Sequence, residues 1–462
     1  MKKILFFSLL LMVQTLQGQV SDLKNPETDP VILNKLEQWK NLKFGLLMHW
    51  GPYSQWGVVE SWSLCSEDED WCRRKLKNYV EYCKEYTQLK NTFNPNRFDP
   101  VKWATAAKYA GMKYVVFTTK HHDGFCMFDT RQTDYKITDP ECPFHTSSKA
   151  DVTKEIFQAF RDQGFWTGAY FSKPDWHCND YWAEEWATPN RNVNYNIKKY
   201  PERWQKYCDF TYKQIEELTT RYGKLDILWL DGGWVEPSNG QDINMPKIAS
   251  MARSNQRDLL IVDRTVTGKY ENYRTPEQQI PDKLLDYPWE TCMTMATSWS
   301  YVPGDIYKPT GKIIHMLADI VCKGGNFLLN IGPSPLGELD DTAYARLREI
   351  GDWMKINGSA IYNTHTIIPY KSDNICLTAD SAGCIYAIYL ATPEETKIPQ
   401  KIRVNGFQPS QGSFIELLGS KGKLKWKSEG ETGFVIEPPS GIRNNPPCKY
   451  AWVFKIHMNN KD

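Results

Sequence analysis

Residues Tyr114-Val115-Val116-Phe117-Thr118-Thr119 form a short apolar run, and Lys120-His121-His122-Asp123-Gly124 follows it directly. An apolar run of this length is typical of a strand that is buried on both faces in a parallel sheet. The same pattern recurs at residues 44–49, 166–171, 225–230, 259–262 and 326–331. These stretches together predict a parallel sheet at the centre of the fold.

Helix-like stretches with clear start and stop signals separate the apolar runs. Asp99-Pro100 predicts the start of a helix over 101–110, which Gly111 ends. Asp151 similarly begins a helix that runs through Phe160 and stops at Gly164. Repeated strand-then-helix units over most of the chain favour an α/β fold of the (β/α)8 barrel type. A doubly wound sheet is disfavoured because no glycine-rich dinucleotide turn follows the first strand.

The pattern changes after a predicted helix over 341–356 that ends at Gly358. Short strands bounded by Gly, Pro, Ser and Asn are predicted at 384–390, 401–404, 414–418, 433–436 and 450–456. The sequence therefore predicts a catalytic (β/α)8-like barrel over 20–358 and a C-terminal β-sandwich domain over 359–462.

Composition excludes several classes of protein. The 462 residues are 41% hydrophobic and 24% charged, and their net charge is +1, so neither disorder nor nucleic-acid binding fits. Aromatic residues make up 13% of the chain, including 18 Trp and 25 Tyr. Such rings are either large buried side chains or faces that stack on sugars.

The first residues have the order of a secretory signal peptide. Lys2 and Lys3 precede an apolar run over 4–13 that is too short to span a bilayer, and polar residues follow it. We therefore predict a signal peptide over 1–19 and an exported protein without a membrane anchor, periplasmic in a Gram-negative source or otherwise extracellular. Cys65 and Cys72 are close enough in sequence to be the best candidates for a local disulfide.

Polar side chains stand at the ends of four predicted strands. The first strand ends in His49, the second in His121 and His122, the fourth in Asp231 and the fifth in Asp263-Arg264. In a parallel barrel these ends open onto one face, where catalytic residues gather. A helix cap is the structural alternative for Asp231, and a metal-ligand pair is the alternative for the histidines. The chain has no HxH or HExxH spacing, so neither a metal nor a cofactor is predicted.

Histidines, tryptophans and isolated carboxylates on one rim suit carbohydrate chemistry. Neutral imidazoles and carboxylates hydrogen-bond sugar hydroxyls, and two carboxyl groups hydrolyse a glycosidic bond. Five stretches carry these groups in order along the chain: Lys43-Phe44-Gly45 leading to His49-Trp50-Gly51-Pro52-Tyr53-Ser54; Thr118-Thr119-Lys120-His121-His122-Asp123-Gly124-Phe125; Leu228-Trp229-Leu230-Asp231-Gly232-Gly233-Trp234; Trp289-Glu290-Thr291-Cys292; and Gly324-Gly325-Asn326-Phe327-Leu328-Leu329-Asn330-Ile331-Gly332-Pro333.

From about residue 40 to residue 360, these motifs make the chain resemble the α-L-fucosidases of glycoside hydrolase family 29. Residues 281–292 also look like the signature segment of that family, with Pro288 where a lysine is usual. The resemblance implies a retaining exo-hydrolase that removes terminal α-L-fucosyl groups by double displacement. It implies Asp231 as the nucleophile and a set of substrate-binding residues: His49, His121, His122, Tyr170, Arg264 and Trp299.

Two glutamates are candidates for the acid/base, whose motif varies in this family. Glu277 lies on a polar loop after the fifth strand, and Glu290 begins the next apolar stretch. Glu277 is preferred and Glu290 is the alternative. The structural alternatives are an ordinary loop charge for Glu277 and a buried carboxylate for Glu290.

One segment departs from the family pattern. The family often has Glu-Trp after the first strand, whereas this chain has Glu60-Ser61-Trp62 followed by an acidic insertion to Cys72. Glu60 and Trp62 are therefore included among the predicted substrate-binding residues, and an L-fucose relative such as L-galactose remains an alternative sugar.

The predicted partner is a fucosylated oligosaccharide or glycoconjugate, and an oligomer is compatible with the sequence. Two other functions are the alternatives. One is a catalytically inactive sugar-binding protein, against which the retained Asp231 argues. The other is a metal-dependent barrel hydrolase that uses His121 and His122.

Overall fold

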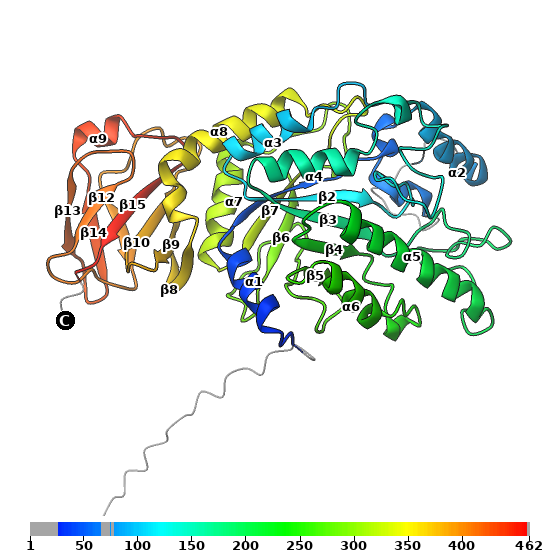
Figure 1. Cartoon of the computed structure of the whole chain (residues 1–462). Helices are drawn as coiled ribbons and strands as arrows, with labels where there is room; N and C mark the ends of the chain where they lie inside the picture. The colour runs from blue at the N-terminus through cyan, green and yellow to red at the C-terminus, as the bar shows by residue number, and fades with distance from the viewer. Residues whose placement is uncertain (1–25, 66–73, 75–77, 460–462) are drawn as a thin grey trace, which may run out of the picture.

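The computed structural model describes residues 26–65, 74 and 78–459, and it contains two sheets that lie side by side along the molecule (Figure 1). The first sheet has seven parallel strands in the order β5-β4-β3-β2-β1-β7-β6. Their bounds are β1 Phe44–Met48, β2 Tyr114–Lys120, β3 Trp166–Ser172, β4 Ile227–Asp231, β5 Leu260–Asp263, β6 Glu290–Thr294 and β7 Asn326–Ile331.

An irregular segment over residues 271–278 joins the two outer strands of this sheet, β5 and β6. The Asn272 amide donates to the carbonyl of Ile261 on β5, and the Gln278 amide donates to the carbonyl of Cys292 on β6. The segment thus occupies the position of an eighth strand without forming one. The barrel-type fold predicted from the sequence is confirmed. Seven regular strands and this irregular segment make up its wall.

Helices cover the outside of the parallel sheet (Figure 1). Both helices that were predicted from their cap residues are present. The Asp99 side chain caps α3 by accepting from the amides of Val101 and Lys102, and the Asp151 side chain caps α4. The helix bounds are α1 Pro30–Lys40, α2 Tyr79–Thr87, α3 Pro100–Tyr109, α4 Val152–Asp162, α5 Pro201–Arg221, α6 Met245–Asn255, α7 Thr310–Cys322, α8 Asp341–Asn357 and α9 Ser440–Asn444.

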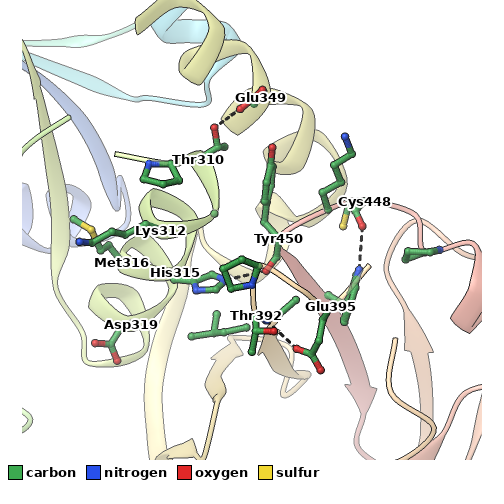
Figure 2. Close-up of a pocket in the computed structure, with 18 of the residues that line it drawn as sticks. Thr310, Lys312, His315, Met316, Asp319, Glu349, Thr392, Glu395, Cys448 and Tyr450 are labelled. Carbon is green, nitrogen blue, oxygen red and sulfur yellow. Dashed lines mark hydrogen bonds between the residues drawn. The ribbon is translucent and has the colours of Figure 1, made fainter. Parts of the chain in front are cut away.

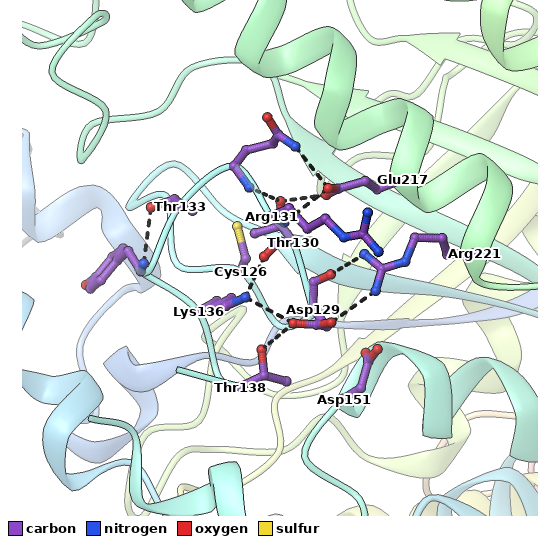
Figure 3. Close-up of polar contacts among 12 residues, drawn as sticks. Cys126, Asp129, Thr130, Arg131, Thr133, Lys136, Thr138, Asp151, Glu217 and Arg221 are labelled. Atoms are coloured by element: carbon purple, nitrogen blue, oxygen red, sulfur yellow. Dashed lines mark hydrogen bonds and ion pairs between the residues drawn. The ribbon is translucent and has the colours of Figure 1, made fainter. Parts of the chain in front are cut away.

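The long loop after β2 is fastened to helix α5 (Figure 3). Asp129 is paired with Lys136 of the same loop and with Arg221 of α5, each at 3.0 Å. The Thr130 hydroxyl donates to Glu217 of α5 at 2.6 Å. These bonds hold the loop that continues from the histidines at the end of β2.

The second sheet has eight antiparallel strands in the order β11-β14-β13-β12-β15-β10-β9-β8. Inward side chains from its strands share one apolar core, which includes Leu377, Phe434 and Trp452. This arrangement agrees with the predicted C-terminal β-sandwich, although three of its strands were not predicted. The bounds are β8 Thr364–Ser372, β9 Ile375–Asp380, β10 Ile385–Leu390, β11 Ile402–Asn405, β12 Phe414–Leu417, β13 Lys423–Ser428, β14 Gly433–Glu437 and β15 Ala451–His457.

The second sheet packs against helices α7 and α8 of the barrel and leaves a cavity of about 1150 Å³ between them (Figure 2). His315 of α7 is hydrogen-bonded through Nε2 to the carbonyl of Tyr450 at 2.8 Å. Lys371 of β8 pairs with Asp319 of α7 at 2.9 Å. These polar contacts join the two parts of the chain.

Within the described ranges, no helix has both the length and the apolar character needed to cross a bilayer. The predicted signal peptide over 1–19 lies outside the described residues, as does Cys72 of the predicted disulfide.

Candidate active site

A cavity of about 300 Å³ opens at the carboxyl ends of the parallel strands, at the small end of the range for ligand pockets. Most residues singled out from the sequence lie in its wall. The lining residues are Leu47, His49, Glu60, Trp62, His121, Tyr170, Arg191, Trp229, Asp231, Gly233, Trp234, Arg264, Thr265, Glu277, Cys292 and Trp299. His122 and Glu290 are outside this set, although His122 Nε2 lies 3.8 Å from Asp231 Oδ2.

Asp231 is the last residue of β4, and its carboxylate is bound on both oxygens. Tyr170 donates its hydroxyl proton to Oδ2 at 2.6 Å, and Arg264 donates from Nη1 to Oδ1 at 2.9 Å. Burial alone would raise the pKa of Asp231, but the Arg264 guanidinium, the neighbouring His122 ring and the hydrogen bonds from Tyr170 and the Gly232 amide outweigh it. The pKa therefore lies well below its usual range, and the carboxylate is ionised.

Arg264 connects Asp231 with Glu277. Its Nη2 donates to Glu277 Oε2 while Nη1 holds Asp231, and its Nε donates to the Thr275 hydroxyl at 3.2 Å. One guanidinium thus binds two carboxyl groups on the cavity wall. The Glu277 side chain is 42% exposed, so solvent can reach its carboxyl group.

Two buried histidines, His49 and His121, line the cavity, and the centre of the buried His122 ring lies 4.2 Å from that of the His121 ring. His49 Nδ1 pairs with Asn330 Oδ1 at 2.8 Å, His121 Nδ1 with Ser61 Oγ at 2.5 Å and His122 Nδ1 with Ser172 Oγ at 2.5 Å.

Burial lowers the pKa of each of these rings. It lowers the pKa of His49 and of His122 to about 4, and that of His121 well below its usual value. The rings are therefore neutral near pH 7 and can exchange hydrogen bonds with hydroxyl groups.

Glu60 lies in the cavity wall, with its backbone in the left-handed region and the pKa of its side chain raised. Its Oε1 accepts from the amide of Ser300 at 2.8 Å, and its backbone φ of 25° falls in the left-handed region. Burial raises the pKa of Glu60 to about 8. Trp62 lies nearby, with its ring centre 5.2 Å from that of His122.

Glu290 lies at the opposite end of the barrel interior. It is the first residue of β6, and Tyr114, the first residue of β2, donates its hydroxyl proton to it. Trp229 Nε1 donates to the other oxygen at 3.3 Å. Burial raises the pKa of Glu290 to about 8, so the carboxyl group is largely protonated at neutral pH.

A Glu290→Gln variant is expected to gain stability relative to the wild type as the pH rises. The folded state keeps a proton on Glu290 that the unfolded chain releases above the ordinary pKa of 4.5. This group's contribution to stability is therefore lost as the pH rises toward 8. The difference between the two proteins should grow by about 1.4 kcal/mol per pH unit. Urea unfolding of both proteins across this pH window measures it, and a pH-independent difference would contradict the assignment of a protonated, buried Glu290.

Arg191, on the loop after β3, lines the cavity but was not among the residues predicted from the sequence. Its carbonyl accepts hydrogen bonds from Trp176, Tyr181 and Trp234 at 3.1–3.2 Å. Its guanidinium lies 4.8 Å from the centre of the Trp62 ring. The loop has no apolar periodicity, so nothing in the sequence assigned this residue to the cavity.

Comparison with known proteins agrees with the geometry. The Alpha-L-fucosidase family model matches residues 11–359, and the Alpha-L-fucosidase C-terminal domain model matches residues 370–457. Plasma alpha-L-fucosidase of Rattus norvegicus is 27% identical over 98% of each chain.

Solved structures agree as well. Alpha-L-fucosidase isoenzyme 1 from Paenibacillus thiaminolyticus has a TM-score of 0.77 and 28% identity, over 93% of this chain and all of its own. Thermotoga maritima alpha-fucosidase in complex with fucose has a TM-score of 0.71 and 25% identity, over 91% and 96%. The resemblance found in the sequence is confirmed, and the chain belongs to the alpha-L-fucosidase family of glycoside hydrolases.

Proposed function

We propose that the protein is an exo-acting, retaining α-L-fucosidase with Asp231 as nucleophile and Glu277 as acid/base. The observation that carries this proposal is the pairing of both carboxyl groups with one guanidinium, that of Arg264, in the wall of a monosaccharide-sized cavity. Retaining glycosidases need their two carboxyl groups roughly 5 Å apart, and a shared guanidinium keeps them close together.

In the first step, an ionised Asp231 oxygen attacks C1 of the fucosyl group while Glu277 protonates the departing oxygen. The bond from C1 to the leaving group breaks as the ester bond to Asp231 forms. In the second step, Glu277 takes a proton from water, and the water oxygen displaces Asp231 from C1. Two inversions return fucose with the α configuration of the substrate.

The remaining cavity residues divide between the sugar and the nucleophile. We assign His49, His121, Glu60 and Trp62 to binding of the sugar. Trp299, whose ring centre lies 5.2 Å from that of His49, is assigned to the apolar face of the sugar. Tyr170, His122 and Arg264 orient Asp231 and also border the sugar. The Thermotoga maritima relative that was crystallised with fucose supports this sugar.

Glu290 is proposed as a structural carboxyl group and not as the acid/base. It is fully buried at the start of β6, away from the strand ends that form the cavity. A general acid must come within hydrogen-bond reach of the leaving oxygen, and Glu277 meets this requirement from the rim.

Export and domain organisation are part of the same proposal. The similarity to a plasma alpha-L-fucosidase supports an exported enzyme that acts on fucosylated oligosaccharides or glycoconjugates. The change from parallel to antiparallel strands between β7 and β8 supports a catalytic domain over 20–358 and a C-terminal domain over 359–462.

A metal-dependent mechanism is the alternative that this site can be tested against. His121, His122 and Asp231 each bring one ligand atom into a group whose members lie within 4.8 Å of one another. Both Asp231 oxygens, however, already accept hydrogen bonds, one of them from the guanidinium of Arg264. That positive charge opposes a cation at the same carboxylate.

The proposed activity predicts that the wild-type protein hydrolyses an aryl α-L-fucoside and first releases α-L-fucose. Proton NMR during the first minutes distinguishes this anomer from β-L-fucose, and EDTA should leave the rate unchanged. Initial β-L-fucose would show inversion, and loss of activity with EDTA would favour the metal mechanism. Fucose binding without hydrolysis would favour the inactive sugar-binding protein, whereas faster cleavage of an aryl α-L-galactoside would change the assigned sugar.

A further inference from the structure

We propose that Gln278 is the positioning residue of Glu277, and that it acts by fastening the acid/base segment to β6 through Thr294. This inference rests on the proposed role of Glu277. It concerns how an exposed carboxyl group on an irregular segment is held in one place.

The backbone on the carboxyl side of Glu277 is bent in a way that side chains rarely allow. Gln278 has a φ of 54° in the left-handed region, where residues other than Gly, Asn and Asp are uncommon. The backbone N–H of Gln278 donates to the carbonyl of Cys292 at 3.0 Å, and the backbone N–H of Cys292 donates to the carbonyl of Pro276 at 3.3 Å. Strained backbone of this kind persists where surrounding contacts fix it, and it gathers at functional sites.

The Gln278 side chain supplies a second attachment to the same strand. Its Nε2 donates to Thr294 Oγ1 at 3.2 Å, and the Thr294 amide donates to Gln278 Oε1 at 3.4 Å. Thr294 is the last residue of β6 and is only 1% exposed. The primary amide thus pairs with both the backbone and the side chain of a buried residue.

Thr294 is itself fixed by every hydrogen bond its hydroxyl group can make. Oγ1 donates to the Ala296 carbonyl at 2.6 Å and accepts from both Gln278 and Lys308 Nζ, the latter at 3.0 Å. Lys308 also donates to the carbonyls of Thr294 and Ala296. A threonine hydroxyl has one proton and two lone pairs, so the anchor for Gln278 is complete.

The consequence is a fixed position for Glu277 between two attachments. On one side Thr275 accepts a hydrogen bond from Arg264, and on the other Gln278 is tied to Thr294. Within the described part of the chain, the Glu277 side chain is hydrogen-bonded to Arg264 alone. Its alignment with a leaving oxygen therefore depends on the segment that carries it.

Leaving-group dependence tests this role. For Gln278→Ala and Gln278→Gly, kcat/KM for unsubstituted phenyl α-L-fucoside is expected to fall by about 10-fold, because a poor leaving group needs a well-placed acid. For the dinitrophenyl fucoside, which needs little protonation, kcat/KM should change by less than about 3-fold. The glycine variant adopts the left-handed backbone without strain, so its loss would report the missing amide and not misfolding.

Neighbouring variants supply the controls. Gln279→Ala changes the next exposed glutamine and should match the wild type. Thr294→Val should reproduce the leaving-group dependence of Gln278→Ala. Thr294→Ser keeps the hydroxyl group and should behave like the wild type with both fucosides. An equal fall for both fucosides would indicate a general loss of folded enzyme and would overturn the proposal.

If Glu277→Ala showed the leaving-group dependence and the Gln278 variants did not, the positioning role would be wrong while the acid/base assignment stood. If Glu277→Ala showed none, the acid/base assignment itself would fail.

Discussion

Replacing Asp231 by glycine is expected to lower kcat for an aryl α-L-fucoside by roughly 10⁴-fold or more. The variant has no carboxylate to attack C1. Burial raises the pKa of Tyr170 well above its usual value, so its phenol stays protonated and does not replace the carboxylate. Azide should restore turnover and yield β-L-fucosyl azide, because the anion enters from the face that Asp231 has left. Enzyme assays with product NMR measure both effects.

An Asp231→Asn variant is the matched control for folding. It keeps the shape of the carboxylate and one of its two acceptor oxygens, so it should still fold while its activity is lost. Activity within about 10-fold of the wild type in either variant would show that Asp231 does not form the covalent bond.

Glu277→Ala is expected to show the second large effect, with a different product. Turnover of poorly activated fucosides should fall by about 10²–10⁴-fold, the usual contribution of general acid–base catalysis. Azide should rescue turnover of an activated aryl fucoside and yield α-L-fucosyl azide, because it attacks the fucosyl-enzyme from the face that water normally uses. The configuration of the azide product thus separates the roles of the two residues.

Glu338→Ala is the control for this variant. Glu338 is 39% exposed and pairs with Arg97 at 3.0 Å, so it resembles Glu277 in exposure and in having an arginine partner. It should retain wild-type kinetics. If Glu290→Ala gave the α-azide product and Glu277→Ala did not, the two glutamates would have to exchange roles.

The sequence predicted the parallel sheet well where strands are continuous apolar runs. Every residue of β2 and β7 is buried, and most of their residues are apolar. β6 was not predicted as a strand because Glu290-Thr291-Cys292-Met293-Thr294 mixes polar and apolar residues. In the C-terminal domain, β13 escaped prediction because Lys423, Lys425 and Lys427 alternate along it.

The candidate site was predictable to the extent that it follows strand ends. His49, His121 and Asp231 each end or follow a buried strand, so the topology alone brings them together. The choice between Glu277 and Glu290 depends on which end of β6 each residue reaches. That register is set by backbone pairing of the irregular segment 271–278 with β6, and no periodic pattern in the sequence encodes it.

Trapping the covalent intermediate identifies the nucleophile directly. Incubation with 2-deoxy-2-fluoro-L-fucosyl fluoride, followed by peptic digestion and tandem mass spectrometry, locates the ester bond. We expect a single fluorofucosyl group on Asp231 and none on the Asp231→Asn variant. A label on another carboxylate, or turnover of ordinary fucosides with no label at all, would contradict it.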